Sequence, residues 1–202
     1  MKTLNNYINE KFQVSKANVG IYIYTPKDKD ELRDILEDRL VDDKDADLNN
    51  IDVSNITDMS ELFVGLDPCD IDISEWNVFN VKNMNHMFWS CEKFNCDLSR
   101  WDVSNVTNMR SIFNGCENFN SDLSKWNVMK VENMSDMFCD CKKFNCDLSK
   151  WDVSKVKYMT AMFYNCEKLN CDLSSWNVTK VEYMNYMFNG CTSLNKPTWY
   201  KG

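Results

Sequence analysis

Apolar residues recur along this chain with a period of 25 residues. Successive copies begin at Ile51, Trp76, Trp101, Trp126, Trp151 and Trp176, with no insertion or deletion between them. Counted from the first residue of each copy, the apolar positions are 1, 3, 6, 9, 12, 13, 16, 19 and 23. In the third copy they are Trp101, Val103, Val106, Met109, Ile112, Phe113, Cys116, Phe119 and Leu123. A constant period of about 20 to 50 residues is typical of a solenoid, in which each unit covers the apolar face of its neighbour. We therefore expect these positions to form one continuous core.

The spacing of apolar residues within a copy predicts two short elements. Positions 9, 12, 13 and 16 are spaced like one face of an α-helix. Residues 94–98 and 144–148 alternate between apolar and polar, which is typical of a half-buried strand. We expect each copy to form one coil whose strand pairs in parallel with the next. The sequence thus predicts an α/β solenoid with one short strand and one short helix per coil.

A strand and a longer helix are predicted before the first copy. Residues 20–24, GIYIY, are β-branched and aromatic and suit a strand that covers the open N-terminal edge of the stack. Thr25 as N-cap and Pro26 at the first helical position predict a helix that runs to about Val41. Its apolar face, expected to cap the first coil, consists of Leu32, Ile35, Leu36 and Leu40.

The chain is therefore expected to have three parts. Residues 1–50 form a lead-in and a capping strand and helix, and residues 51–196 form six coils. Residues 197–202 form a minimal C-terminal cap, because Pro197 leaves the motif and cannot donate a hydrogen bond to a ladder.

The repeat motif W-[DN]-V-x-[NK]-V-x-x-M-x-x-M-F-x-x-C-x-x-[FL]-N-x-D-L-S resembles the BspA-like leucine-rich repeats of bacterial surface proteins. The resemblance covers about residues 47–195. It implies a right-handed solenoid of the leucine-rich-repeat type on the surface of a bacterium. It also implies binding to a host or neighbouring-cell protein, and no enzyme activity.

Composition narrows the function classes. With 44% hydrophobic and 13% aromatic residues, the chain can bury a core. Its net charge of −8 would repel a nucleic acid. The sequence contains no run of 18 apolar residues, which a membrane-spanning helix would need. Residues 1–12 lack the apolar segment of a secretory signal. The sequence as written thus predicts a cytoplasmic protein, whereas the resemblance favours the cell surface.

The cysteines follow the repeat. Of the ten cysteines, five lie at position 16 and three at position 21. The first copy has Leu66 at position 16, which favours packing as small apolar side chains over disulfides or a metal site. We expect buried free thiols and no cofactor. Cys139 lies at the variable position 14 and is expected to be exposed.

Three polar positions also repeat. Positions 20 and 22 are Asn or Asp in nearly every copy, and we expect their side chains to accept hydrogen bonds from backbone N–H groups at the coil corners. A row of Ca²⁺-binding carboxylates is the alternative. Position 2 alternates strictly between Asp and Asn. This pattern fits either reduced charge repulsion between coils or inheritance of a 50-residue double unit.

Candidate binding residues lie at the variable positions, which the periodicity places toward solvent. They are Trp89, Tyr158, Tyr164, Tyr183 and Tyr186. Exposed aromatic side chains often anchor protein interfaces, although these rings could equally lie flat on neighbouring coils and cover the core. His86 is the only histidine, and no phosphate loop or catalytic motif occurs. We therefore predict a non-catalytic module that binds another protein, with glycan binding through the tyrosines or a cysteine-based metal or redox role as alternatives.

Overall fold

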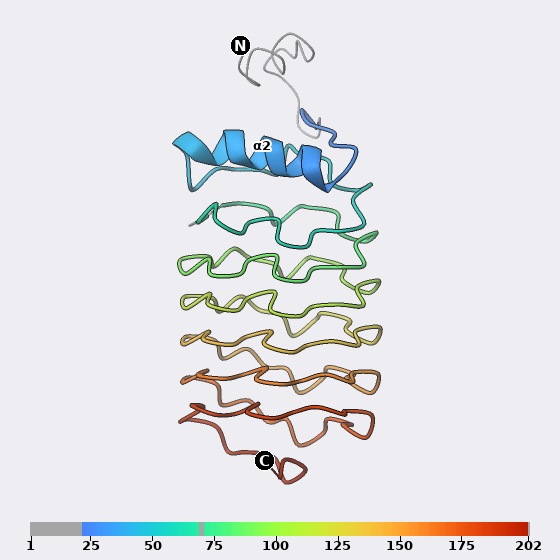
Figure 1. The fold of residues 1–202 in the computed structure, drawn as a ribbon, viewed down its shortest axis with the longest axis vertical. Helices are drawn as coiled ribbons and strands as arrows, with labels where there is room; N and C mark the ends of the chain where they lie inside the picture. The colour runs from blue at the N-terminus through green and yellow to red at the C-terminus, as the bar shows by residue number, and fades with distance from the viewer. Residues whose placement is uncertain (1–21, 69–70, 202) are drawn as a thin grey trace.

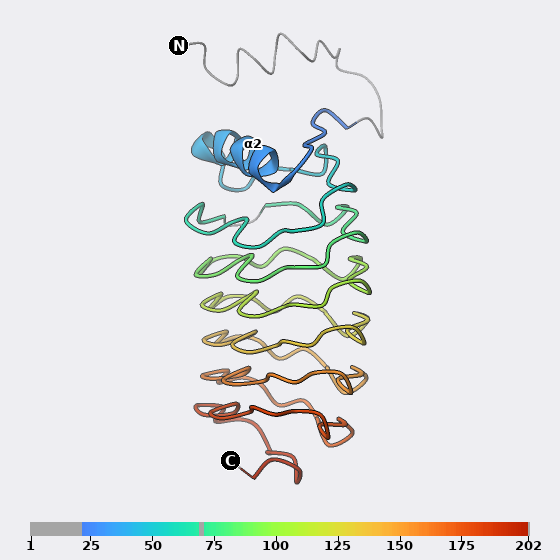
Figure 2. The same ribbon diagram turned by 45° about the vertical axis from the view of Figure 1, so that its right-hand side comes forward.

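The chain winds into coils that stack along one axis. The computed structural model describes residues 22–68 and 71–201. Consecutive coils lie next to each other, with helix α2 (Lys29–Asp42) across one end of the stack and the C-terminus at the other (Figures 1 and 2). Isolated parallel bridges join residues 25 positions apart, at position 8 of each copy: Asp58 to Asn83, Asn83 to Asn108, Asn108 to Asn133, Asn133 to Tyr158, and Tyr158 to Tyr183.

Helix α2 begins three residues later than the predicted first turn. Asp28, not Thr25, is the N-cap, and its side chain accepts a hydrogen bond from the Glu31 N–H at 3.0 Å. A carboxylate so placed satisfies one of the free N–H groups of the first turn. The predicted apolar face is confirmed, since all four of its side chains are buried: Leu32, Ile35, Leu36 and Leu40.

The segment before α2 pairs with the first coil. Tyr24 forms a parallel bridge with Ile51, and the Asp52 N–H donates to the Tyr24 carbonyl at 2.8 Å. This part of the predicted capping strand is in place. Residues 20 and 21, like the lead-in of residues 1–18, lie outside the described residues.

The predicted core positions are buried along the stack. Phe113 lies between Phe88 and Phe138, with 5.7 Å between ring centroids on each side, and packs on Phe119 at 4.0 Å. The tryptophans of position 1 form a second column. Trp101, for example, donates its indole N–H to the Ile73 carbonyl at 3.0 Å. The core therefore consists of continuous columns of similar apolar side chains.

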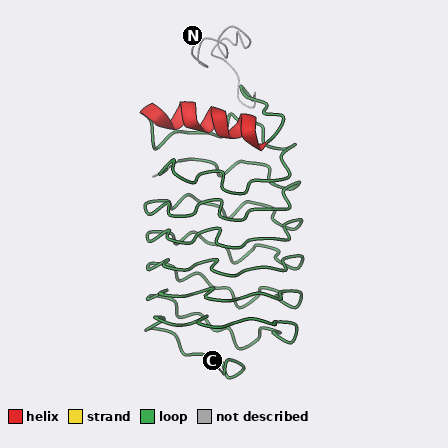
Figure 3. Cartoon of the chain, viewed as in Figure 1, coloured by secondary structure: helices red, strands yellow, loops and turns green. Residues whose placement is uncertain are grey.

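The short helix predicted in each coil is wrong. Outside α2, the described residues contain no helix (Figure 3). Positions 9–16 instead form successive tight turns: the Ile112 N–H donates to the Met109 carbonyl at 3.3 Å, and Cys116 N–H to Phe113 at 2.9 Å. The third residue of these turns, position 11 or 15, has positive φ in every copy, as at Ser111 (53°) and Gly115 (78°). Two consecutive turns reproduce the three- and four-residue spacing of a helix, which is why the apolar pattern misleads.

The backbone N–H groups of these turns bond to the next coil. Met109, Ser111, Phe113 and Gly115 donate to the carbonyls of Asn133, Ser135, Met137 and Cys139 at 2.8 to 3.0 Å. All four bonds point toward the C-terminal end of the stack. An α-helix would need these N–H groups for hydrogen bonds within its own coil. Because they bond to the next coil instead, no helix forms here.

The predicted strand at residues 94–98 alternates between buried and exposed side chains as expected, but it is not assigned as a strand. Side chains stand between its backbone and the next coil. The Asn95 Oδ1 accepts from the Asn120 N–H at 2.7 Å, and the Ser121 Oγ accepts from the Leu98 N–H at 3.0 Å. Backbone pairing of strands is replaced here by backbone-to-side-chain bonds.

The other repeated polar residues hold the corners of the coils, as predicted. At position 22, the Asp97 Oδ1 accepts from the Ser99 N–H at 2.9 Å. At position 2, Asp102 and Asn127 make the same bond to the residue two positions ahead. Because Asn performs this role as well as Asp, the alternation at position 2 preserves the turn while it halves the number of stacked charges.

Candidate interaction surface

Two of the predicted aromatic residues meet near the C-terminal end of the stack, and a third, Tyr186, is exposed on the last coil. Tyr158 and Tyr183 occupy position 8 of adjacent coils, and their rings stack with 5.6 Å between centroids and 12° between planes. Tyr158 is 37% exposed, Tyr183 53% and Tyr186 62%. We call these three residues the tyrosine patch. Features of both interpretations occur here, because the three rings are exposed and those of Tyr158 and Tyr183 lie flat against each other across adjacent coils.

Charged side chains border the tyrosine patch at position 7. The Lys157 ammonium lies 2.8 Å from the Glu132 carboxylate of the preceding coil. This hydrogen bond lowers the pKa of Glu132 and raises the pKa of Lys157. Both groups are therefore charged at neutral pH, and they form a polar rim beside an aromatic centre, as in many protein interfaces.

Tyr164 and Trp89 do not belong to this patch. Tyr164 is partly buried at position 14 of the coil that contains Tyr158. Trp89 is 44% exposed at the same position three coils earlier, so about 15 Å separates them at roughly 5 Å per coil. Trp89 instead contacts His86, edge to face, at 5.8 Å. The predicted site therefore divides into the tyrosine patch and two separate residues, Tyr164 and Trp89.

His86 lies among charged side chains, and one of its ring nitrogens makes no hydrogen bond within the described residues. Its Nδ1 is buried and has no hydrogen-bond partner among the described residues. Burial and the positive charge of Arg110 lower the pKa of His86, which keeps its ring neutral. Arg110 also lies 3.8 Å from Asp136, whose own pKa is raised by burial.

Sequence reasoning missed two exposed apolar residues. Phe79 is 48% and Met129 43% exposed, and both occupy position 4, where the other copies have Ser or Thr. The replacement of Ser or Thr by Phe and Met at position 4 was the sequence signal by which they could have been predicted. They lie two coils apart and do not form a continuous patch with the tyrosines.

The repeated carboxylates are occupied by their own turns. Hydrogen bonds from Ser99 and Ser124 lower the pKa of Asp97 and Asp122, and the same effect acts on Asp147 and Asp172. Within residues 22–68 and 71–201, no group of three His, Cys, Asp or Glu side chains is arranged to hold a metal ion. The position 22 carboxylates thus have a structural role as turn acceptors.

The cysteines at position 16 also have a structural role. The Cys141 thiol donates to the Phe113 carbonyl of the preceding coil at 3.0 Å, and burial raises its pKa. All nine described cysteines are free thiols, and seven of them are buried, which confirms the predicted packing role.

The predicted exposure of Cys139 is wrong. This residue is partly buried, and its thiol lies 3.3 Å from the Asp140 carboxylate. Burial and this negative charge raise its pKa to about 12. Cys139 is therefore not a reactive nucleophile.

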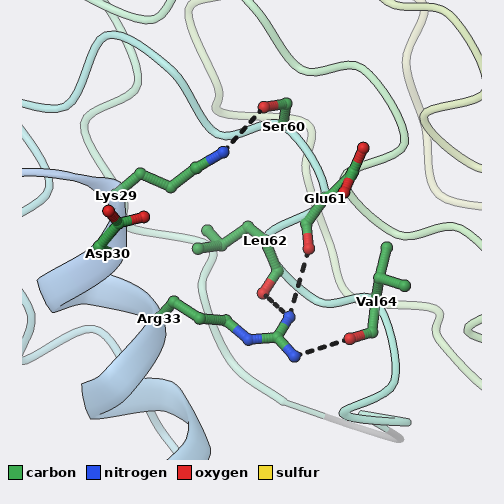
Figure 4. Close-up of a pocket in the computed structure, with 7 residues that line it drawn as sticks. All are labelled: Lys29, Asp30, Arg33, Ser60, Glu61, Leu62 and Val64. Atoms are coloured by element: carbon green, nitrogen blue, oxygen red, sulfur yellow. Dashed lines mark hydrogen bonds between the residues drawn. The ribbon is translucent and has the colours of Figure 1, made fainter.

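A pocket of about 280 Å³ lies between α2 and the first coil, and the guanidinium of Arg33, which lines it, is already hydrogen-bonded (Figure 4). The Arg33 guanidinium crosses the pocket and donates to the carbonyls of Glu61, Leu62 and Val64 at 3.2, 2.7 and 2.8 Å. In later coils the carbonyls at positions 12 and 14 accept from the preceding coil, which the first coil lacks, so Leu62 and Val64 have Arg33 as their donor instead. Arg33 thus caps the start of the ladder, and the pocket is part of the cap.

Stacked coils with similar apolar internal columns and variable outer side chains define a repeat protein. A family described as "Mycoplasma protein of unknown function, DUF285" matches residues 36–139 and again 121–200, and the chain belongs to this family. No curated protein and no solved structure matches the chain. In the described parts, no helix is long and apolar enough to cross a membrane.

Proposed function

We propose that the chain is a non-catalytic protein-binding module of the BspA-like, leucine-rich-repeat solenoid type, which holds its partner through the tyrosine patch. The partner is another protein, from a host or a neighbouring cell. The repeat motif supports this class, and the family membership agrees with it at the level of a repeat family.

One observation carries the proposal. In the first four coils the side chain at position 8 accepts a hydrogen bond from its own turn, as Asn108 does from the Arg110 N–H at 3.1 Å and Asn133 from Ser135 at 3.0 Å. Tyr158 and Tyr183 replace these turn acceptors with exposed rings that cannot make this bond. The substitution sacrifices a stabilising contact inside the coil and gains nothing in the core. A role outside the coil explains it, and large rigid aromatics supply much of the energy of protein interfaces.

The double variant Tyr158→Asn/Tyr183→Asn tests this proposal. Asn is the residue that three other copies carry at this position, so the variant should fold as stably as the parent or more so. We expect immobilised parent protein to enrich a partner from surface extracts of host or neighbouring cells. We expect the double variant to lose at least about 90% of that enrichment.

The control is Phe79→Ser, which restores the common residue at position 4 on an exposed site away from the patch. This control should retain the partner. Equal retention by the double variant and the control would refute the proposal. Binding of the parent to a glycan array, with loss in the same double variant, would instead favour the glycan-binding alternative.

Display on the cell surface is part of the proposal, because a host or neighbouring-cell partner requires it. A membrane-impermeant biotin reagent applied to intact source cells should label the protein. Labelling only after lysis would favour the cytoplasmic alternative.

A further inference from the structure

The last coil carries a row of backbone donors without acceptors. In the coil before it, Met159, Ala161, Phe163 and Asn165 donate to carbonyls of the last coil at 2.7 to 3.0 Å. The equivalent N–H groups of the last coil have no such bond among the described residues. We call this row the donor edge, and it consists of the N–H groups of Met184, Tyr186, Phe188 and Gly190.

The same end of the stack leaves part of the apolar core uncovered. Val178, Val181, Met184 and Leu194 are only partly buried. Their counterparts one coil earlier are buried: Val153, Val156, Met159 and Leu169. Residues 197–200 cover only part of this end, where Trp199 stacks on Trp176 at 6.4 Å and Tyr200 contacts Phe188 at 4.9 Å. Apolar side chains and aligned donors are thus exposed together.

The direction of the ladder limits what can bind there. At positions 9, 11, 13 and 15 the bonds between coils run from an N–H to a carbonyl of the following coil, although at position 7 they run to the preceding coil, as from Glu182 to Lys157. The carbonyls of residues 184–190 already accept bonds from their own turns or from the coil before, so the donor edge presents N–H groups alone. Like the N-terminus of a helix, this edge carries partial positive charge and calls for acceptors. Two copies of the chain that met edge to edge would place donors against donors. In a head-to-tail arrangement, two of the four equivalent carbonyls of the first coil, those of Leu62 and Val64, are already bound by Arg33 of α2.

We propose that the donor edge binds a segment of a different protein, which lies along residues 184–190 and continues the stack. Its backbone aligns carbonyl oxygens with the four N–H groups, and its apolar side chains cover Val181 and Met184. Addition of a segment to an exposed backbone edge is a common mode of peptide recognition. The inference rests on the proposed function, since Tyr183 and Tyr186 adjoin the edge and would contact the same partner.

The test uses the full chain and a synthetic peptide with the sequence of residues 151–175, kept under reducing conditions. This peptide contains the coil pattern that supplies such carbonyls inside the stack, and a scrambled peptide is its control. Amide hydrogen exchange is measured by NMR. We expect exchange at Met184, Tyr186, Phe188 and Gly190 to slow at least about tenfold with the peptide and not with the scrambled control.

Met184→Lys should abolish this protection by placing a charge where the apolar cover must lie. The matched control, Met129→Lys, makes the same substitution at an exposed site on a distant coil and should leave protection intact. Thermal melts of both variants establish that they fold. Protection that persists in Met184→Lys, or that never occurs in the parent, would overturn the inference. Protection of these amides by self-association without peptide, detected by sedimentation, would assign the edge to a second copy and likewise overturn it.

The tyrosine double variant separates the two proposals. If Tyr158→Asn/Tyr183→Asn loses the cellular partner while the parent shows no peptide protection, the edge inference fails and the proposed function stands. If the peptide protects the edge but the double variant keeps the partner, the role of the tyrosine patch fails.

Discussion

Replacement of Phe113 by alanine tests the architecture at its centre. Phe113 is fully buried in the third coil, and its ring packs against Phe88, Phe119 and Phe138 at 5.7, 4.0 and 5.7 Å. Removal of a buried Phe side chain destabilises a protein by about 3 to 5 kcal/mol. The folded state loses the favourable free energy of burying the ring, and a cavity remains in its place. The upper part of this range is expected here, since the ring has stacked partners on both sides.

Urea denaturation followed by tryptophan fluorescence measures this effect, because a tryptophan of the position 1 column lies in five of the six coils. For a chain of about 200 residues, the expected change corresponds to a lower Tm by about 6 to 20 °C. Arg110→Ala on the same coil is the control. Its side chain is 53% exposed and its contact with Asp136 is 3.8 Å long, so the expected change is below about 0.5 kcal/mol. Equal effects of the two substitutions would refute the assignment of core and surface positions.

Three other predictions concern the polar groups. The pKa values of Asp97 and Asp122 are lower in the folded chain than the ordinary 3.8, so the stability they add is present above pH 4 and is lost as pH falls through their folded pKa values. Asp97→Asn/Asp122→Asn keeps both turn acceptors and should therefore lose less Tm than the parent between about pH 5 and about pH 2; an identical loss would contradict this. Arg33→Met should destabilise the chain by about 1 to 3 kcal/mol in urea titrations, because the Leu62 and Val64 carbonyls lose their donor, and a neutral result would show that water replaces the guanidinium. Under native, non-reducing conditions, iodoacetamide should slowly label the two partly buried thiols, Cys139 and Cys171, before any other described cysteine. Peptide mass spectrometry measures the order in which the cysteines are labelled. Cysteines that stay unlabelled after denaturation until a reductant is added would indicate disulfides instead.

The positions of the core were predictable from the sequence, whereas the backbone path between them was not. Val103, Phe113 and Phe119 are buried as the period of 25 requires. The path of positions 9–16 was missed because apolar spacing records which side chains point inward and not where N–H groups bond. Gly115 and its Gly, Asn, Asp or Ser counterparts at position 15 were the available sign of positive φ, since these residues tolerate it best.

The tyrosine patch was only partly predictable. Variable positions identified Tyr158 and Tyr183 as outward-facing, but their stacking depends on both residues having the same position in adjacent coils. Trp89 and Tyr164 share a position too, yet three coils separate them. Sequence position alone gives the column of a residue, and contact further requires neighbouring coils. Exposure of Cys139 was inferred from its variable position in the repeat. Its burial depends instead on the side chains around it.

The coil interface has a genetic consequence. The Asn108 and Asn133 carbonyls accept equivalent ladder bonds in successive coils, and the Phe88 and Phe113 carbonyls accept equivalent bonds from the thiols of Cys116 and Cys141. A gene that lost codons 101–125 would therefore join two surfaces that already match. Unequal recombination between copies can therefore lengthen or shorten the array without opening its core. Each such event would move the tyrosine patch by about 5 Å relative to the end capped by Arg33. The reach of the module is thus a heritable quantity that changes in whole coils.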